Sequence, residues 1–111
     1  MQTLATESGP PHAVVIGAGF GGIAAALRLR AKGYAVTLLE RGDRLGGRAQ
    51  AFEKDGFRHD AGPTVLTATW LFDELFQLFG KTREDYVTFV PLSPWYRFYY
   101  QDGTKIGRAH V

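Results

Sequence analysis

The sequence contains no cysteine among its 111 residues, which excludes a disulfide-linked scaffold and any zinc or iron–sulfur site held by thiolates. The three histidines show no metal-ligand spacing, so we expect no metal. No apolar run reaches the roughly 18 residues that a membrane-spanning helix needs. The basic residues are scattered and the net charge is only +2, so we do not expect nucleic acid as a partner.

The leader, residues 1–12, has neither the basic nor the apolar stretch of a secretory signal, and we expect it to be disordered. Glycine is abundant, with 14 residues, and arginine outnumbers lysine. Glycine lets backbone N–H groups approach an anion closely, and the planar guanidinium group matches phosphate oxygens. Both features favour a backbone that binds phosphate.

Three consecutive segments predict a strand–helix–strand unit. Ala13–Ile16 is a short apolar run typical of a strand that is buried on both faces of a parallel sheet. Apolar residues at helical spacing predict a helix over Gly22–Lys32, with Gly33 as its C-cap. Ala35–Leu39 predicts the second strand. The fold class is therefore α/β, a partial Rossmann-type βαβ fold with a right-handed crossover.

Shorter elements are expected further along the chain. Asp55-Gly56 predicts a tight β-hairpin between Gln50–Lys54 and Phe57–Asp60. The pattern over Thr67–Phe79 predicts a helix that stops at Gly80. We also expect a turn with a capping box at Thr82–Asp85, strands at Tyr86–Val90 and Trp95–Gln101, and a turn at Asp102-Gly103. The domains are then a leader (1–12), a nucleotide-binding βαβ segment (13–66), the start of a substrate or cap region (67–105) and a tail (106–111).

Residues 17–22 spell G-A-G-F-G-G, the dinucleotide-binding fingerprint, between a predicted strand and a predicted helix. Glu40 follows the first glycine by 23 positions, close to the ~20 expected of the residue that binds ribose. Its carboxylate would repel a 2′-phosphate, which disfavours NADP, but the fingerprint does not choose between NAD and FAD. The candidate cofactor-binding residues of this part are Gly17, Gly19, Phe20, Gly21, Gly22 and Glu40.

A second glycine turn follows. The string Arg44-Leu45-Gly46-Gly47-Arg48 resembles the R-x-G-G-R signature of flavoproteins of the amine-oxidase and carotenoid-desaturase superfamily. The resemblance implies FAD, with this turn lying against it. Backbone amides of the glycine pair can approach the diphosphate, and an arginine can neutralise it. We take Arg41, Gly47 and Arg48 as the candidate residues of this segment.

The string D-A-G-P-T-V at residues 60–65 resembles bacterial and fungal phytoene desaturases. The resemblance continues through L-F-D-E-L-F at 71–76 to D-G-T at 102–104, and covers about residues 13–105. It implies that Gly62, Pro63 and Thr64 lie near the flavin ring. It also implies an FAD-dependent oxidoreductase that introduces double bonds into a long hydrophobic polyene in carotenoid biosynthesis. The whole protein would then dock peripherally on the cytoplasmic face of a membrane, where such a substrate resides.

Several alternatives stay open. Within the superfamily they are a ketolase, an amine oxidase or a retinol-saturase-like enzyme, and outside it a stand-alone nucleotide-binding module. The family's proteins are several times longer, so we expect this chain to be an inactive part whose catalytic residues follow Val111. The resemblance fades at Ile106, and the last six residues can be encoded by a sequencing-adapter sequence, so we expect them to be foreign to the family.

Other side chains are weaker candidates. His59 and Asp60 are neighbours on a predicted strand and point to opposite faces, so a structural histidine is favoured over an acid/base pair. His12 and His110 are expected in loops. Phe72, Phe76 and Phe79 are expected to be core rather than tunnel lining. The aromatic cluster at 95–100 fits a substrate channel and sheet packing equally well.

Overall fold

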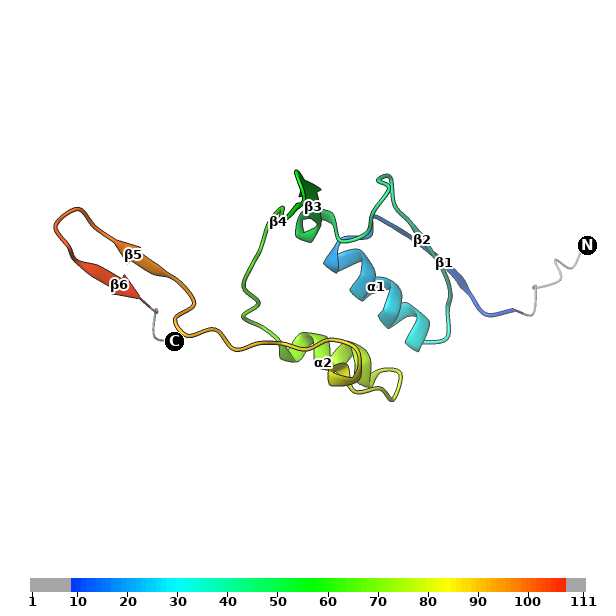
Figure 1. Ribbon diagram of the computed structural model, residues 1–111. Helices are drawn as coiled ribbons and strands as arrows, with labels where there is room; N and C mark the ends of the chain where they lie inside the picture. Colours follow the sequence, from blue (N-terminus) through cyan, green and yellow to red (C-terminus); the bar gives the residue numbers. More distant parts are fainter. Residues whose placement is uncertain (1–8, 108–111) are drawn as a thin grey trace, which may run out of the picture.

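A computed structural model describes residues 9–107, and its first unit is a parallel βαβ arrangement. Strand β1 (His12–Ile16) pairs in parallel with β2 (Ala35–Leu39), and helix α1 (Phe20–Ala31) connects them. Figure 1 shows α1 lying along this two-stranded sheet. The predicted Rossmann-type unit is confirmed, and α1 begins two residues before the predicted start.

One face of this sheet is open to solvent. Val15 faces α1 and is half-buried, whereas Val14 and Ile16 on the other face are 55% and 85% exposed. The prediction that both faces of β1 are buried is therefore wrong, because no element of residues 9–107 covers the second face. The expectation that His12 lies in a loop is also wrong, since it opens β1 and is hydrogen-bonded through Nε2 to the Thr37 hydroxyl at 2.8 Å.

Glycine ends α1 as the sequence predicts. Gly33 adopts a left-handed conformation (φ +93°), which a residue with a side chain rarely takes. Its N–H donates to the Arg30 carbonyl at 3.0 Å, and the Tyr34 N–H donates to the Leu29 carbonyl at 3.2 Å. These are the two bonds of a Schellman motif, which satisfies the last carbonyls of the helix.

The middle of the chain forms short local elements. A single helical turn, η1 (Gly47–Ala49), leads into the predicted hairpin of β3 (Ala51–Lys54) and β4 (Phe57–Asp60). Asp55 and Gly56 at its tip both have positive φ, as a type I′ turn requires. Helix α2 (Trp70–Gln77) is shorter at both ends than predicted and is followed by left-handed Gly80.

The last elements depart furthest from the prediction. A short turn, η2 (Arg83–Asp85), forms, but the Thr82 side chain makes no capping bond. The strand predicted at Tyr86–Val90 does not form, because no described strand lies beside it to pair with. The strand predicted at Trp95–Gln101 shortens to β5 (Arg97–Tyr99), which pairs with β6 (Lys105–Gly107) across the expected Asp102-Gly103 turn.

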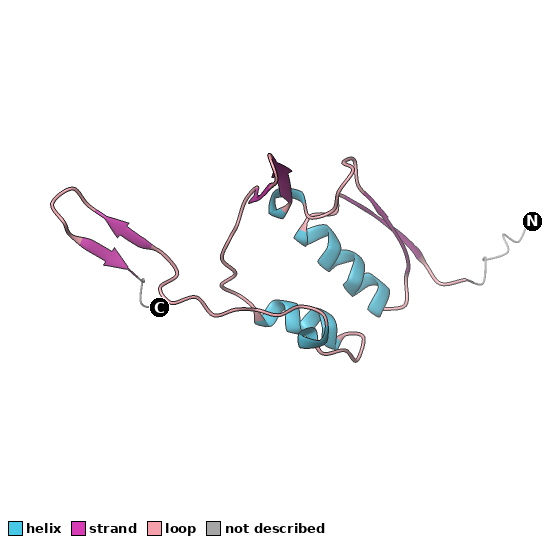
Figure 2. Ribbon diagram, viewed as in Figure 1, coloured by secondary structure: helices cyan, strands magenta, loops and turns pink. Residues whose placement is uncertain are grey.

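The described chain is elongated rather than packed around one core. Its radius of gyration is 20.6 Å, against about 13 Å for a compact domain of ~100 residues. Three separate two-stranded sheets are visible in Figure 2, and β5–β6 lies apart from the rest. Ala18 is the one fully buried apolar residue between positions 9 and 107. Most of the predicted leader and tail, at 1–8 and 108–111, lies outside the described residues.

Candidate functional site

The first glycine turn fastens the end of β1 to both neighbouring elements. Gly17 has a φ of +96°, and its N–H donates to the Leu39 carbonyl of β2 at 2.7 Å. A β-carbon built on Gly22 would lie 1.8 Å from the Gly17 carbonyl oxygen. Helix α1 therefore begins directly against the backbone of the turn, a close approach that only glycine at position 22 permits.

The second glycine turn lies against the first, backbone to backbone. The Gly46 N–H donates to the Ala18 carbonyl at 2.7 Å, and Gly19 and Gly46 are bridged like residues of parallel strands. Gly46 and Gly47 both have positive φ. A β-carbon on Gly47 would approach the Gly19 Cα to 3.1 Å, closer than most side chains allow. Backbone conformation thus favours glycine at both positions, and the close approach to Gly19 requires it at Gly47 as well.

A third glycine-containing segment packs on the second. A β-carbon on Gly62 would lie 2.1 Å from the Arg48 carbonyl oxygen, so the two backbones touch. The Ala61 N–H donates to the Gln50 carbonyl at 2.8 Å and fixes the register of this approach. The hairpin β3–β4 joins the two segments, which explains how residues 14 positions apart come together.

These three segments line one open pocket of about 630 Å³. Space is free in front of Gly21, where an added β-carbon would meet no atom within 4 Å. The pocket lies at the N-terminus of α1, whose first turn carries no acidic residue, so the positive end of the helix dipole is not offset there. The lining residues are Gly19, Phe20, Gly21, Gly46, Arg48, Ala49, Ala61, Gly62 and Pro63.

Glu40, the residue after β2, is hydrogen-bonded to the backbone of the first glycine turn. One carboxylate oxygen accepts a hydrogen bond from the Gly42 N–H at 2.8 Å, and the other accepts one from the Ala18 N–H at 2.7 Å. The Gly42 bond, followed by the Ala18 bond, lowers the pKa of Glu40 below its ordinary value. The group is therefore a carboxylate at neutral pH, with lone pairs left for another donor.

The structure sorts the predicted site residues into two groups. Six line the pocket: Gly19, Phe20, Gly21, Arg48, Gly62 and Pro63. The other six do not line it. Gly17, Gly22 and Gly47 form part of the backbone turns around the pocket, and Glu40 accepts a hydrogen bond from the first turn. Arg41 and Thr64 are exposed residues of loops. Three lining residues were missed, Gly46, Ala49 and Ala61. The glycine doublet was an available signal for Gly46, and the D-A-G-P-T-V string that contains Ala61 was one for that residue, whereas nothing local distinguishes Ala49.

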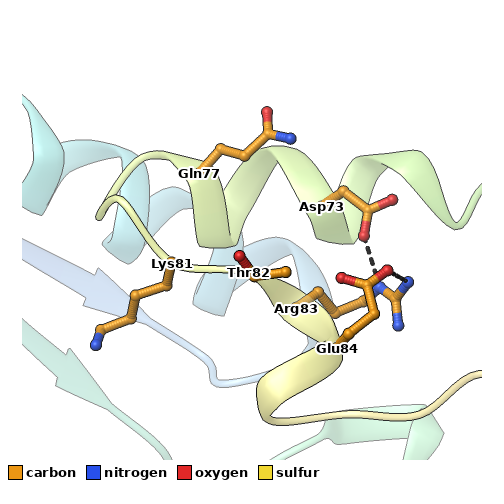
Figure 3. A pocket seen from close by; sticks show the side chains of 6 residues that line it. All are labelled: Asp73, Gln77, Lys81, Thr82, Arg83 and Glu84. Carbon is orange, nitrogen blue, oxygen red and sulfur yellow. Dashed lines mark hydrogen bonds and ion pairs between the residues drawn. The ribbon is translucent and has the colours of Figure 1, made fainter.

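His59 and Arg83 lie outside this pocket, and each contacts other side chains of the chain. His59 stacks on Phe52 across the β3–β4 hairpin with ring centroids 5.1 Å apart, which agrees with a structural histidine. A smaller hollow of about 260 Å³ beside α2 is drawn in Figure 3, where Arg83 is paired with Asp73 and Glu84. Residues 9–107 contain no group of three metal-ligating side chains and no helix long and apolar enough to cross a membrane.

Comparison with known proteins agrees with this geometry. A family model described as "NAD(P)-binding Rossmann-like domain" matches residues 15–82. Similar curated proteins include "Phytoene desaturase (lycopene-forming)" of Pantoea ananas, 52% identical over 80% of this chain, and that of Pseudescherichia vulneris, 47% identical over 87%. "4,4'-diaponeurosporene oxygenase" of Staphylococcus aureus is 43% identical over 86%.

These matches cover 18%, 20% and 19% of the three relatives, so the chain spans about a fifth of their length. They confirm the resemblance to phytoene desaturases that the sequence motifs predict. The family match runs from the last two residues of β1 through the glycine turns, α1 and β2 to α2, and so contains the segments that line the pocket. The chain therefore belongs to the family of NAD(P)-binding Rossmann-like domains.

Proposed function

We propose that this chain is the N-terminal, FAD-binding part of a carotenoid desaturase of the phytoene desaturase type. The observation that carries the proposal is the convergence of three glycine-containing segments on one pocket at the N-terminus of α1. The similarity to two phytoene desaturases directs the choice of cofactor and substrate class.

The pocket suits the adenosine diphosphate half of FAD. Gly19 and Gly21 present backbone without side chains at the helix N-terminus, where a diphosphate is stabilised by N–H groups and by the helix dipole. Arg48 lines the same pocket and would neutralise the diphosphate by charge-assisted hydrogen bonds. Glu40, kept ionised by its backbone bonds, would accept hydrogen bonds from ribose hydroxyls and repel a 2′-phosphate.

FAD, when bound, supplies the capacity to accept the two electrons released as two adjacent carbons each lose a proton and the single bond between them becomes a double bond. The residues of this chain bind and orient the adenine half. In the proposal Gly62, Pro63 and Thr64 run toward the flavin ring, and the substrate is a long hydrophobic polyene. The whole enzyme docks peripherally on the cytoplasmic face of the membrane that holds this substrate.

Titration of the purified chain with ADP, FAD and NAD by calorimetry tests the proposal. We expect ADP and FAD to bind with similar Kd, because most of the proposed contacts, those of the glycine turns, Arg48 and Glu40, are with the half that the two share. Arg48→Ala should raise the Kd about tenfold or more, since hydrogen bonds to charged groups contribute ~1.5–3 kcal/mol. Arg58→Ala is the matched control, because Arg58 lies on the exposed β4 strand outside the pocket.

Absence of ADP binding, or equal loss in the Arg48 and Arg58 variants, would contradict the assignment of the pocket. Tighter binding of NAD than of FAD would contradict the cofactor but leave the dinucleotide site standing.

A carotenoid oxygenase is the second candidate, because one of the similar proteins is a diaponeurosporene oxygenase. The two candidates share the cofactor half that this chain would bind and differ in the product. Expression of the full-length gene in a carotenoid-producing host separates them, since a desaturase extends the conjugated system whereas an oxygenase adds oxygen. An oxygenated product would favour the oxygenase and overturn the desaturase assignment.

A further inference from the structure

One residue of the nucleotide pocket reaches the neighbouring helix. The ring of Phe20, the first residue of α1, meets the ring of Phe72 on α2 edge to face, with centroids 5.6 Å apart and planes at 86°. Phe72 in turn meets Phe89 in the same way, at 5.5 Å and 83°. Edge-to-face rings at these distances attract one another beyond the area that they bury. A row of three rings therefore connects the pocket with the segment after α2.

The outer end of this row is fixed by Arg83. Its guanidinium carbon lies 4.2 Å from the centre of the Phe89 ring, and its Nη1 donates to the Val87 carbonyl at 2.8 Å. Its Nε donates to the carboxylate of Asp73, the neighbour of Phe72 on α2, at 2.6 Å. Figure 3 shows this ion pair between the helix and the turn that follows it. The side chain of Arg83 is only 11% exposed, so these interactions are partly shielded from solvent.

Arg83 thus connects Phe89 back to α2, because its partner Asp73 is adjacent to Phe72 in the chain. The Phe72 ring lies between Phe20 and Phe89, and the guanidinium group of Arg83 packs on the Phe89 ring. A second link between the helices, the exposed ion pair of Arg28 and Glu74 at 3.1 Å, lies further along α1. Exposed pairs of this kind contribute little, so of these two links the ring contact is the one that lies at the pocket and is expected to be the stronger.

We propose that Phe72 is a positioning residue of the nucleotide site, holding Phe20 and with it the N-terminal turn of α1. The inference rests on the proposed function for the identity of the ligand. Because coupling between two sites is reciprocal, a nucleotide in the pocket also steadies α2. Helix α2, which follows residue 66, then supports the nucleotide site in addition to beginning the proposed cap region.

Phe76 provides a matched control on the same helix. It is half-buried like Phe72, but its ring stacks on Tyr86, with centroids 5.3 Å apart, on the side of the turn that follows α2. Phe72→Ala and Phe76→Ala remove the same side chain from one helix. Only Phe72→Ala removes a ring that contacts Phe20 of the pocket.

Calorimetric titration of the full chain with ADP is the first measurement. Phe72→Ala should raise the Kd about 3- to 10-fold, as loss of an aromatic pair predicts, and Phe72→Tyr, which keeps the ring, should restore it. Hydrogen exchange without ligand is the second. The Ile23 N–H, which donates to the Gly19 carbonyl at 2.9 Å, should exchange faster in Phe72→Ala and not in Phe76→Ala. ADP should slow exchange in α2 of the wild-type chain.

Unchanged ADP binding and unchanged Ile23 exchange in Phe72→Ala would overturn the inference while leaving the proposed function intact. Equal effects of Phe72→Ala and Phe76→Ala would also overturn it, because both would then report a general loosening of α2. If the wild-type chain bound no ADP, the proposed function would fail, and Ile23 exchange alone would decide whether Phe72 supports the turn.

Discussion

Gly22→Ala tests whether α1 must begin in direct contact with the Gly17 turn. The new β-carbon would lie 1.8 Å from the Gly17 carbonyl oxygen and 2.9 Å from its carbon, so the backbones must separate by about 1 Å or more. Overpacking of this kind costs ~1–3 kcal/mol, more than the up to ~1 kcal/mol that alanine gains over glycine inside a helix. The clash therefore wins, and amides of α1 should exchange with solvent about 10- to 100-fold faster.

Gly21→Ala is the control at the preceding position of the same helical turn. A β-carbon on Gly21 would meet no atom within 4 Å, so only the gain in helix propensity remains, and α1 should become slightly more protected. Hydrogen exchange measured by NMR should therefore be faster than wild type for α1 amides in Gly22→Ala and slower in Gly21→Ala. Equal protection of α1 in the two variants would refute the claim that close packing at Gly22 shapes the turn.

Three further perturbations follow from the same contacts. Gly62→Ala places a β-carbon 2.1 Å from the Arg48 carbonyl oxygen and should weaken ADP binding about tenfold in calorimetry by displacing the loop. Glu40 has a lowered pKa, so the stability from its backbone bonds is present above about pH 4.5 and is lost as the pH falls through the lower pKa of the folded state. A carbon-13 titration of its carboxyl group should have its midpoint below 4.5, and Glu40→Gln should remove this part of the pH dependence of stability. Arg83→Met leaves Asp73 without its cation and should speed exchange in α2 about tenfold, which mass spectrometry can follow. An unchanged ADP Kd, a midpoint at the ordinary glutamate value, or unchanged exchange would each contradict the corresponding contact.

The parts of the fold that could be predicted are those that neighbouring residues decide. Gly33 and Gly80 end their helices, and Asp55-Gly56 turns a hairpin, because each adopts a left-handed backbone that the surrounding sequence demands. The ends of α2 were predicted less well. Thr67 and Thr69 fit the apolar period poorly and are weak helix formers, so the helix begins only at Trp70.

The parts that failed depend on distant partners. The segment Tyr86–Val90 has the composition of a strand, but a strand needs a neighbour to receive its backbone hydrogen bonds, and no described strand is placed there. The burial of β1 was overestimated for a related reason, since sequence cannot say whether a second layer covers the sheet. In the site, the sequence predicts the glycine motifs but not the close approach of Gly62 to Arg48, which depends on how the intervening hairpin folds.

The two glycine turns of the site are joined through their backbones, and Ala18 lies at their contact. It is the one fully buried apolar residue among those described, and both its backbone groups are engaged, the N–H with Glu40 and the carbonyl with the Gly46 N–H. The deepest burial in this part of the chain therefore lies where the two glycine turns meet, and it is built from backbone bonds rather than packed side chains. The exposed apolar residues of β1, Val14 and Ile16, lie on the face of the sheet away from α1. Polar substitutions there should change solubility without changing ADP binding, because the pocket takes its shape from the turns and not from that face.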